Sequence, residues 1–396
     1  MNNNKENRFV PELRFPEFTN SGDWKEKLLC KVSSAIFDGT HQTPKYTTEG
    51  IPFFSVENII SGNKNKFISK QDYLLATSKN KPEKGDILIT RIGNIGFSKI
   101  VDWDYEFSIY VTLAVVKKNE MVDSYYLHSF FQSNFFQKNI RSKSLLNAVP
   151  CKINMDELRT TKVLLPPDTS KKEQQKVAAC FFSLDQIING QIQKIEILKE
   201  HKKGLMQNLF PNNGEKGPKL RFKEFAKYGD WKQLELKKLL EIGSGKDYKH
   251  LLKGNIPVYG SGGYMQSVDN YLYDGESVCI GRKGTIDKPI FLSGKFWTVD
   301  TLFYTHSFKN CIPKFIYFIF QKINWKNYNE AGGIPSLNKT TIGKIEVYIP
   351  NLKEQQKIVE CLSALDYSIE SEVKHLDVLK DHKKGLMQQL FPEINE

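Results

Sequence analysis

The sequence contains few cysteines and no long apolar run, and each absence excludes a class of protein. Its six cysteines lie far apart and none belongs to a CxxC pair, which argues against a disulfide-bonded scaffold and against a zinc ribbon. No apolar stretch approaches the ~18 residues that a membrane-spanning helix requires. The polar residues 1–7 lack the apolar core of a signal peptide. We therefore expect a soluble, cytoplasmic protein with no membrane partner.

Sequence motifs of catalysis and cofactor binding are also missing. Gly243-Ser-Gly-Lys246 has part of a phosphate-binding loop, but Leu240 stands where the loop needs its first glycine, and Asp247 stands where it needs Ser or Thr. The seven histidines form no HExxH motif, and no GxGxxG loop follows a predicted strand. The sequence thus predicts a chain that has no catalytic residues, no cofactor and no metal of its own.

What the sequence does contain is length, aromatic residues and positive charge. Its 396 residues are enough for two or three domains at roughly 150 residues each. Apolar residues make up 40% and aromatic residues 12% of the chain, which is too many for a disordered protein. The 57 Lys and Arg residues outnumber the 45 Asp and Glu residues, so the formal net charge is +12. This excess favours a polyanion as the partner.

The chain is an internal duplication. Residues 11–25 and 218–232 match at ten of fifteen positions and share the pattern LRFxEFxxxGDWK. Residues 173–211 and 354–392 match at 20 of 39 positions, and both begin with EQQK and contain HKKGLMQ near the end. Each half therefore consists of a leading segment, a divergent middle and a shared closing segment.

The closing segments are predicted to be long helices. Apolar residues recur in alternating steps of three and four, as in a coiled-coil seam, with polar gaps at Gln191, Lys202, Glu372 and Lys383. We expect one helix over 171–210, about 60 Å long, and an equivalent second helix. Two seams of equal length favour antiparallel pairing, which would place the two middles at opposite ends. The alternative is that each helix packs on its own domain.

The divergent middles share an order of elements. The first has predicted strands and one helix at 86–91, 110–116, 124–138 (the helix) and 162–165. The second has the same order at 277–281, 298–304, 313–321 (the helix) and 344–349. Such runs predict small mixed domains that share a fold and differ in surface.

The sequence therefore predicts an α+β fold. Two mixed α/β domains would be separated by two long antiparallel helices that form a coiled coil, with an internal pseudo-twofold repeat. The predicted division is 1–167 for the first domain, 168–212 for the central helix, 213–350 for the second domain and 351–396 for the C-terminal helix.

Each middle carries polar, glycine-rich loops of a kind that contacts DNA. In both, the pattern R-x-G-[N/T]-I follows a predicted strand, and its first residue is Arg91 or Arg282. Arginine binds the two acceptors of guanine in the major groove, Asn or Thr binds adenine or a phosphate, and glycine lets the backbone approach a partner closely. A second polar loop, VPCKIN or IPSLNK, precedes the last strand of each middle.

The candidate DNA-binding residues come from these loops and from the glycine-rich segments that precede them. They are Thr40, His41, Thr43, Lys45, Tyr46, Arg91, Asn94, Lys152, Asn154, Lys246, Ser261, Tyr264, Arg282, Lys283, Thr285, Ser336, Asn338 and Lys339. Each loop also has a plain structural interpretation, namely a turn with a solvated arginine or an ordinary loop before the last strand.

The whole chain resembles the specificity subunit of a type I restriction-modification system. The resemblance rests on the repeated LRFxEFxxxGDWK and EQQK…LKxHKKGLMQxLFP segments around two variable middles. The runs IPFFSVENI and IPVYGSGG also resemble the target-recognition domains of that family. The resemblance implies that each middle is a target-recognition domain that reads one half of an asymmetric, two-part site in double-stranded DNA.

The resemblance also implies partners. The helices would set the spacer between the half-sites and dock two modification (adenine methyltransferase) subunits, and restriction (nuclease and translocase) subunits would complete the complex. Because the family's specificity subunit has no catalytic residues, S-adenosylmethionine, Mg and ATP are expected only on the partner subunits.

Three other functions remain as alternatives. A single-chain enzyme would need a cofactor or metal motif hidden in a middle. A stand-alone DNA-binding regulator would bind DNA tightly without partner subunits. A duplicated adaptor would bind protein and have no affinity for DNA.

Overall fold

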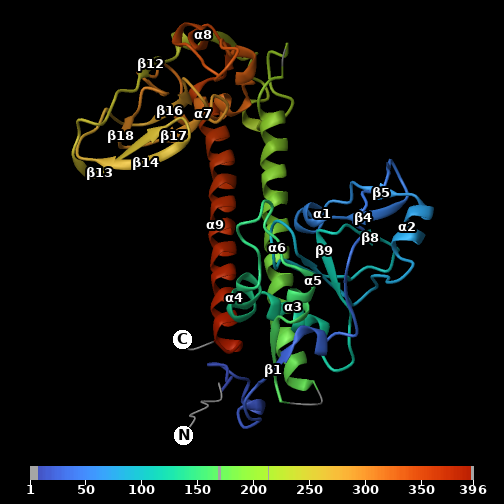
Figure 1. The fold of residues 1–396 in the computed structure, drawn as a ribbon. Coiled ribbons are helices and arrows are strands. Elements are labelled where there is room, and N and C mark those ends of the chain that lie inside the picture. The colour runs from blue at the N-terminus through green and yellow to red at the C-terminus, as the bar shows by residue number, and fades with distance from the viewer. Residues whose placement is uncertain (1–7, 168–170, 213, 394–396) are drawn as a thin grey trace. The chain divides into compact units, whose positions relative to one another are not determined.

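The computed structural model describes residues 8–167, 171–212 and 214–393 (Figure 1). The polar stretch 1–7 and the predicted boundary residues 168 and 213 lie outside the described residues. Among the residues that are described, no helix is both long and apolar enough to cross a membrane.

The chain divides into two units. Unit 1 comprises the residues up to Ile192 together with those from His375 onward, and unit 2 comprises Gln193–Lys374. Each long helix therefore contributes to both units. The four-part division into domains and helices stays a prediction.

Unit 1 holds one pair of strands and two four-stranded sheets. The antiparallel pair consists of β1 (Lys25–Leu28) and β10 (Lys162–Leu165). The first sheet is antiparallel, in the order β2 (Ile36–Asp38), β9 (Leu113–Val116), β6 (Ile87–Thr90) and β7 (Ser98–Ile100). The second has the order β3 (Tyr46–Thr47), β5 (Phe67–Ile68), β4 (Ile51–Phe54) and β8 (Ser108–Ile109), with β4 and β8 parallel. Its short helices are η1 (Pro16–Phe18), η2 (Leu29–Lys31), α1 (Val56–Ser61), α2 (Lys70–Ala76), α3 (Ser124–Phe131), α4 (Asn134–Ser142) and α5 (Met155–Arg159).

Unit 2 repeats this plan. Its strand pair is β11 (Lys232–Glu235) with β20 (Glu346–Ile349). Its first sheet has the order β12 (Glu241–Ser244), β19 (Leu302–His306), β16 (Ser277–Gly281) and β17 (Ile290–Leu292). Its second has the order β14 (Gly263–Val268), β13 (Lys253–Gly260), β18 (Lys295–Thr298) and β15 (Tyr273–Asp274), with β13 and β18 parallel. Its short helices are η3 (Lys223–Phe225), η4 (Leu236–Lys238), α7 (Pro313–Lys322), η5 (Trp325–Tyr328) and α8 (Lys339–Gly343).

Three predicted elements are divided in the structure. The strands predicted at 110–116 and 298–304 both contain a turn, which leads from β8 to β9 in unit 1 and from β18 to β19 in unit 2. In each case the turn takes the chain from one four-stranded sheet to the other. The helix predicted at 124–138 is two helices, because Ser133 adopts an extended backbone and its hydroxyl accepts from the Phe136 amide as the N-cap of α4.

The two closing segments are the long helices α6 (Lys172–Leu209) and α9 (Leu352–Leu390). Glu173, only 1% exposed, accepts hydrogen bonds from Arg14 Nε at 2.7 Å and from Trp24 Nε1 at 3.3 Å. The equivalent set in unit 2 is Glu354, Arg221 and Trp231, at 2.7 and 3.2 Å. The repeated leading segment therefore holds the first residue of EQQK, which fixes the start of each helix against its domain.

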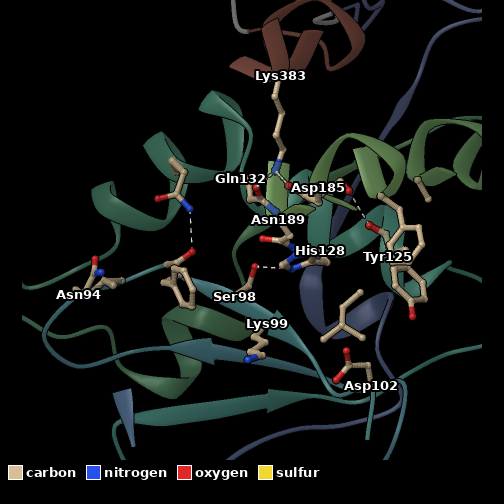
Figure 2. A pocket seen from close by; sticks show the side chains of 18 of the residues that line it. Asn94, Ser98, Lys99, Asp102, Tyr125, His128, Gln132, Asp185, Asn189 and Lys383 are labelled. Atoms are coloured by element: carbon tan, nitrogen blue, oxygen red, sulfur yellow. Dashed lines mark hydrogen bonds and ion pairs between the residues drawn. The ribbon is translucent and has the colours of Figure 1, made fainter. Parts of the chain in front are cut away.

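Within each unit, α6 and α9 run antiparallel and are joined by ion pairs. In unit 1, Lys383 Nζ of α9 lies 2.6 Å from Asp185 Oδ1 of α6 and also donates to Gln132 at 2.9 Å (Figure 2). In unit 2, Lys202 Nζ of α6 lies 2.6 Å from Asp366 Oδ1 of α9. We call these two ion pairs the cross-helix pairs. Three of the four polar gaps predicted in the seam, at Lys202, Lys383 and Glu372, thus form ion pairs between the helices.

The predicted antiparallel pairing is confirmed. A further ion pair joins Lys194 of α6 to Glu372 of α9 at 2.6 Å. From Lys194 to Lys202 the residue number rises along α6, while the number of the α9 partner falls from 372 to 366, as antiparallel helices require. The alternative also holds in part, because Val177 and Phe181 of α6 lie in the apolar core of unit 1. The helix packs on the domain that it leaves and also pairs with α9.

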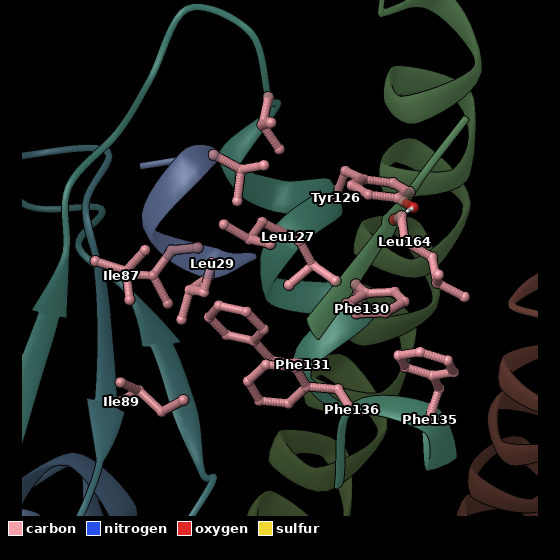
Figure 3. Packing of buried hydrophobic residues seen from close by; sticks show 14 of the residues in the cluster. Leu29, Ile87, Ile89, Tyr126, Leu127, Phe130, Phe131, Phe135, Phe136 and Leu164 are labelled. Atoms are coloured by element: carbon pink, nitrogen blue, oxygen red, sulfur yellow. Dashed lines mark hydrogen bonds between the residues drawn. The ribbon is translucent and has the colours of Figure 1, made fainter. Parts of the chain in front are cut away.

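The core of unit 1 holds the strand that leads into the candidate loops. Aromatic side chains of α3 and α4 pack between β6 and the long helix α6 (Figure 3). Phe131 and Phe136 stack with ring centroids 4.3 Å apart, and Ile89 of β6 belongs to the same fully buried cluster. This packing fixes Ile89 near the end of β6, two residues before Arg91.

Candidate nucleic-acid interface

In each unit the two predicted DNA-contacting loops meet through the same backbone hydrogen bonds. In unit 1 the Ile153 amide donates to the Arg91 carbonyl at 2.9 Å, and the Gly93 amide donates to the Cys151 carbonyl at 2.8 Å. The equivalent bonds in unit 2 run from Leu337 to Arg282 and from Gly284 to Pro335, both at 2.9 Å. Gly93 and Gly284 have φ of 86° and 84°, a left-handed conformation that favours glycine. The fold thus joins loops that lie far apart in the sequence.

Unit 1 exposes most of its candidate residues. Those that are exposed or half-buried are Thr40, His41, Thr43, Lys45, Tyr46, Asn94, Lys152 and Asn154. His41 Nε2 lies 3.0 Å from Asp38 Oδ2, and Thr43 Oγ1 lies 3.1 Å from the Tyr110 hydroxyl. These two contacts tie the loop after β2 to the sheets on either side of it.

Arg91 is the exception in unit 1, because its side chain is buried. Its guanidinium lies 2.9 Å from Asp38 Oδ2 and donates to the carbonyl oxygens of Val111 at 3.1 Å and Ile153 at 3.3 Å. Only 9% of the side chain is exposed. These donors were predicted to contact a DNA base, whereas in the structure they bind Asp38 at the end of β2 and the carbonyl oxygens of two loops. This geometry favours a structural role for Arg91.

The equivalent arginine of unit 2 has a different environment. Arg282 is exposed, and across the described ranges no hydrogen bond or ion pair engages its guanidinium. It lines a cavity of about 400 Å³ with four other candidate residues, namely Lys283, Ser336, Asn338 and Lys339. The cavity therefore combines three cations and one carboxylate, that of Glu330, with neutral hydrogen-bonding groups, and its excess of positive charge is suited to DNA.

Two polar residues of this cavity were missed from the sequence. Ser244 ends β12 inside the Gly-Ser-Gly-Lys run, of which only Lys246 was predicted to contact DNA. Glu330 accepts hydrogen bonds from Asn338 Nδ2 and from the Thr341 hydroxyl, a contact for which no sequence motif exists. Asn338 also caps α8 through Oδ1, which accepts from the Thr341 amide at 2.7 Å. Part of its hydrogen-bonding capacity is therefore used within the protein.

The remaining candidate residues of unit 2 do not line this cavity. A β-carbon at Gly284 would meet Ser261 Oγ at 3.3 Å, so Ser261 is a neighbour of the arginine loop. Lys246 is exposed just beyond β12, and Thr285 is half-buried. Tyr264 is 62% exposed in β14, and its hydroxyl lies 3.1 Å from Ser267 Oγ rather than at the cavity.

A second cavity, of about 660 Å³, lies in unit 1 and contains a chain of polar contacts (Figure 2). His128 Nδ1 lies 2.9 Å from Ser98 Oγ, and His128 Nε2 lies 3.2 Å from Gln132 Nε2, whose side-chain oxygen binds Lys383. Burial lowers the pKa of His128 to about 4, while Asp185 raises it and Lys383 lowers it by smaller amounts. A histidine this weakly basic is neutral at pH 7 and is a poor general base.

The cysteines and acidic residues offer little for catalysis. Burial raises the pKa of the Cys279 thiol to about 12 and that of Cys311 to about 11, so both thiols stay protonated and weakly nucleophilic at neutral pH. Over the part of the chain that is described, no three His, Cys, Asp or Glu residues group closely enough to hold a metal ion.

Known proteins share both the sequence pattern and the fold. Two Methanocaldococcus jannaschii proteins that carry the names MjaX and MjaVIII type I restriction enzyme specificity subunit are 24% and 23% identical to this chain. The first alignment covers 93% of both chains, and the second covers 86% of this chain and 85% of the relative. The crystal structure of a type I restriction-modification S subunit from M. genitalium aligns over 98% of this chain and 100% of its own, with a TM-score of 0.67 at 18% identity.

A second solved structure, from work on assembly and conformational transition of the type I system, aligns over 93% of this chain and 97% of its own, with a TM-score of 0.55 at 13% identity. The family model of the type I restriction modification DNA specificity domain matches twice, at residues 26–197 and 228–381. These matches include both loop clusters and most of both long helices. The chain therefore belongs to the family of type I restriction modification DNA specificity proteins.

Proposed function

We propose that this chain is the DNA-reading subunit of a type I restriction-modification complex, in which unit 1 and unit 2 each read one half of an asymmetric, two-part site. The candidate DNA-binding residues given above are the proposed contacts, with Arg91 now expected to support the reading loops of unit 1 rather than to touch a base.

One observation carries this proposal. The same backbone hydrogen bonds join an arginine loop to a second polar loop in both units, yet the exposed side chains on the two frames differ. A shared backbone arrangement of the two loops that carries different exposed side chains is suited to reading two different DNA sequences with one kind of domain. The formal charge of +12 supports a polyanionic partner for both surfaces.

We further propose that the chain supplies no catalysis. The weakly basic His128 and the raised thiol pKa values of Cys279 and Cys311 support this. Methyl transfer and cleavage would then belong to two modification subunits and to restriction subunits, which would bind S-adenosylmethionine, Mg and ATP. The paired helices α6 and α9 would dock the modification subunits and set the spacer between the half-sites, and the complex would act in the cytoplasm.

The test is to map methylation in cells that lack other adenine methylation. The chain is expressed with its modification subunit, and modified adenines are located by single-molecule sequencing. The expected result is one two-part motif with different halves and a fixed spacer. The control strain carries the modification subunit alone and should show no motif. A motif that persists without this chain would contradict the proposal.

The purified chain distinguishes the alternatives. By itself it should transfer no methyl groups to DNA, and transfer would favour a single-chain enzyme. Tight, sequence-specific binding by the chain alone would favour a stand-alone regulator. A complex with the modification subunit that has no affinity for DNA would favour an adaptor.

A further inference from the structure

The two arginine loops occupy the same place in equivalent sheets. In unit 1, Asp38 of β2 pairs with Ala114 of β9, which pairs with Ile89 of β6. The same cross-strand row, or rung, exists in unit 2, where Ser244 of β12 pairs with Phe303 of β19, which pairs with Ile280 of β16. Arg91 and Arg282 each follow two residues after the β6 or β16 member of the rung. Ser244 therefore stands where unit 1 has Asp38.

This one position decides whether the arginine is engaged. The carboxylate of Asp38, itself 22% exposed, binds the Arg91 guanidinium at 2.9 Å and leaves it 9% exposed. Ser244 carries no charge, and both it and Arg282 line the cavity of unit 2. A neutral hydroxyl cannot form an ion pair such as the one that joins Asp38 Oδ2 to a guanidinium nitrogen of Arg91. The Arg282 guanidinium is therefore left to solvent or to a ligand.

The chemistry of the cavity indicates which ligand it takes. A guanidinium presents parallel N–H groups that match two neighbouring acceptors, such as O6 and N7 of guanine or two oxygens of a phosphate. The Glu330 carboxylate lies in the same lining and disfavours a fully charged phosphate at this point. The exposed ammonium groups of Lys283 and Lys339 at the cavity are better placed to bind the backbone on either side. The two acceptors of a guanine edge fit best.

We infer that Ser244 is a specificity-determining residue, because it leaves Arg282 free to read a guanine in the half-site of unit 2. The inference rests on the proposed function. By the same reasoning Arg91 reads no base, since Asp38 occupies its guanidinium, and unit 1 reads its half-site with other side chains.

The experiment combines variants of the chain with changes in the DNA. Ser244→Asp should bind Arg282 internally, and Arg282→Ala should remove it. In methylation mapping with the modification subunit, both variants should lose discrimination at the same guanine by about 10- to 100-fold, as expected for one bidentate contact. The half-site of unit 1 should be unchanged in both. Adding Ser244→Asp to Arg282→Ala should have no further effect.

Two controls keep the test independent of misfolding. Ser293→Asp adds the same charge at an exposed site of unit 2 away from the cavity and should leave both half-sites unchanged. On the DNA side, 7-deazaguanine at the read position lacks the N7 acceptor. It should weaken binding by the wild-type complex, and it should not weaken binding by the complex with Arg282→Ala.

Each contrary result has a distinct meaning. If Arg282→Ala weakens binding to all DNA sites equally, and if the binding constant then depends less steeply on salt concentration, the arginine binds a phosphate and the inference is wrong. If Arg282→Ala relaxes a guanine and Ser244→Asp does not, Ser244 is not the determinant. If the wild-type chain directs no two-part motif at all, it is the proposed function that fails.

Discussion

Unit 1 and unit 2 are alike where the helices begin and unlike where the loops face outward. Glu173 and Glu354 bind the same pair of side chains at nearly the same distances. At the loops, Asp38 is replaced by Ser244, and a buried arginine becomes an exposed one. The two copies of the domain keep the residues whose hydrogen bonds fix the start of each long helix. In contrast, a single substitution beside the retained arginine changes whether that arginine is exposed on the surface.

The largest expected effect lies in the shared part. Glu173→Ala and Glu354→Ala each leave a buried arginine and a tryptophan N–H without their partner, so each should lower the free energy of unfolding by about 3–5 kcal/mol. Urea unfolding followed by hydrogen exchange should place the loss in unit 1 for Glu173→Ala and in unit 2 for Glu354→Ala.

The repeats also provide a matched control for this prediction. Glu17 and Glu224 occupy equivalent surface positions and pair with Lys176 at 3.3 Å and Lys357 at 3.7 Å. Because these pairs are exposed, Glu17→Ala and Glu224→Ala should each change stability by about 0–1 kcal/mol. Equal losses in the buried and the exposed pairs would show that the buried networks do not fix the start of each helix against its own domain.

The next effect separates the two arginines. Arg91→Ala leaves two carbonyl oxygens without their donor and the Asp38 carboxylate with His41 alone, so it should destabilise unit 1 by about 2 kcal/mol. Arg282→Ala removes no contact that the described residues make and should change stability by about 0.5 kcal/mol or less. Thermal unfolding of the two variants measures the difference. A similar loss in both would mean that the two arginines are equivalent after all.

The acid response should also differ between the units. The side-chain oxygen of Gln174 accepts a hydrogen bond from the Asp123 amide just before α3, and that of Gln355 accepts one from the Ile312 amide just before α7. When α3 and α7 are aligned on these two amides, Tyr317 of unit 2 stands where unit 1 has His128. The folded pKa of His128 is about 4, below its usual value of 6.5, so the unfolded chain binds more protons between these values. The stability contributed by neutral His128 is complete above pH 6.5 and is lost as the pH falls toward 4.

Between pH 7 and pH 5 this loss should reach about 2 kcal/mol, confined to unit 1. Hydrogen exchange of each unit at the two pH values measures it. The variant His128→Gln should remove the pH dependence of unit 1 and leave unit 2 as it was. If wild type and variant lose the same protection at pH 5, another group is responsible.

The smallest effect concerns the cross-helix pairs. Lys383 and Lys202 are equivalent in the repeat, are 16% and 13% exposed, and each pairs with a half-buried aspartate. Lys383→Met and Lys202→Met should each cost about 1 kcal/mol, because the ion pair is partly screened by water. Double-mutant cycles with Asp185→Ala and Asp366→Ala should return equal coupling energies. A coupling in only one of the two would break the equivalence of the units at the helices.

The sequence predicted the helices well because their signal is local and repeated. The apolar period and the proline limits place α6 within a residue of its observed ends, and antiparallel pairing follows from two equal seams. The polar gaps at Lys202 and Lys383 were visible, but their aspartate partners were not. Those partners depend on the register of two helices that are far apart in the sequence.

The candidate loops were only partly predictable. The pattern R-x-G-[N/T]-I treats Arg91 and Arg282 alike, since the motif is the same in both. The residue that separates them is Asp38 or Ser244, on a strand that reaches the arginine only through sheet pairing. Likewise, the strands predicted at 110–116 and 298–304 gave no sign that the chain changes sheet within them. Contacts made through pairing between distant strands leave little trace in a single sequence.

The antiparallel register of α6 and α9 constrains how such a chain can change in length. Position 185 contacts 383 and position 202 contacts 366, so the two cross-helix pairs share one sum of residue numbers. Four residues inserted near Gln191 in α6 alone would move Lys202 by about 6 Å along the axis and away from Asp366. The same four residues added to α9 between 366 and 383 would restore both pairs. A change in the length of one helix between the cross-helix pairs is therefore matched in register only by an equal change in the other helix.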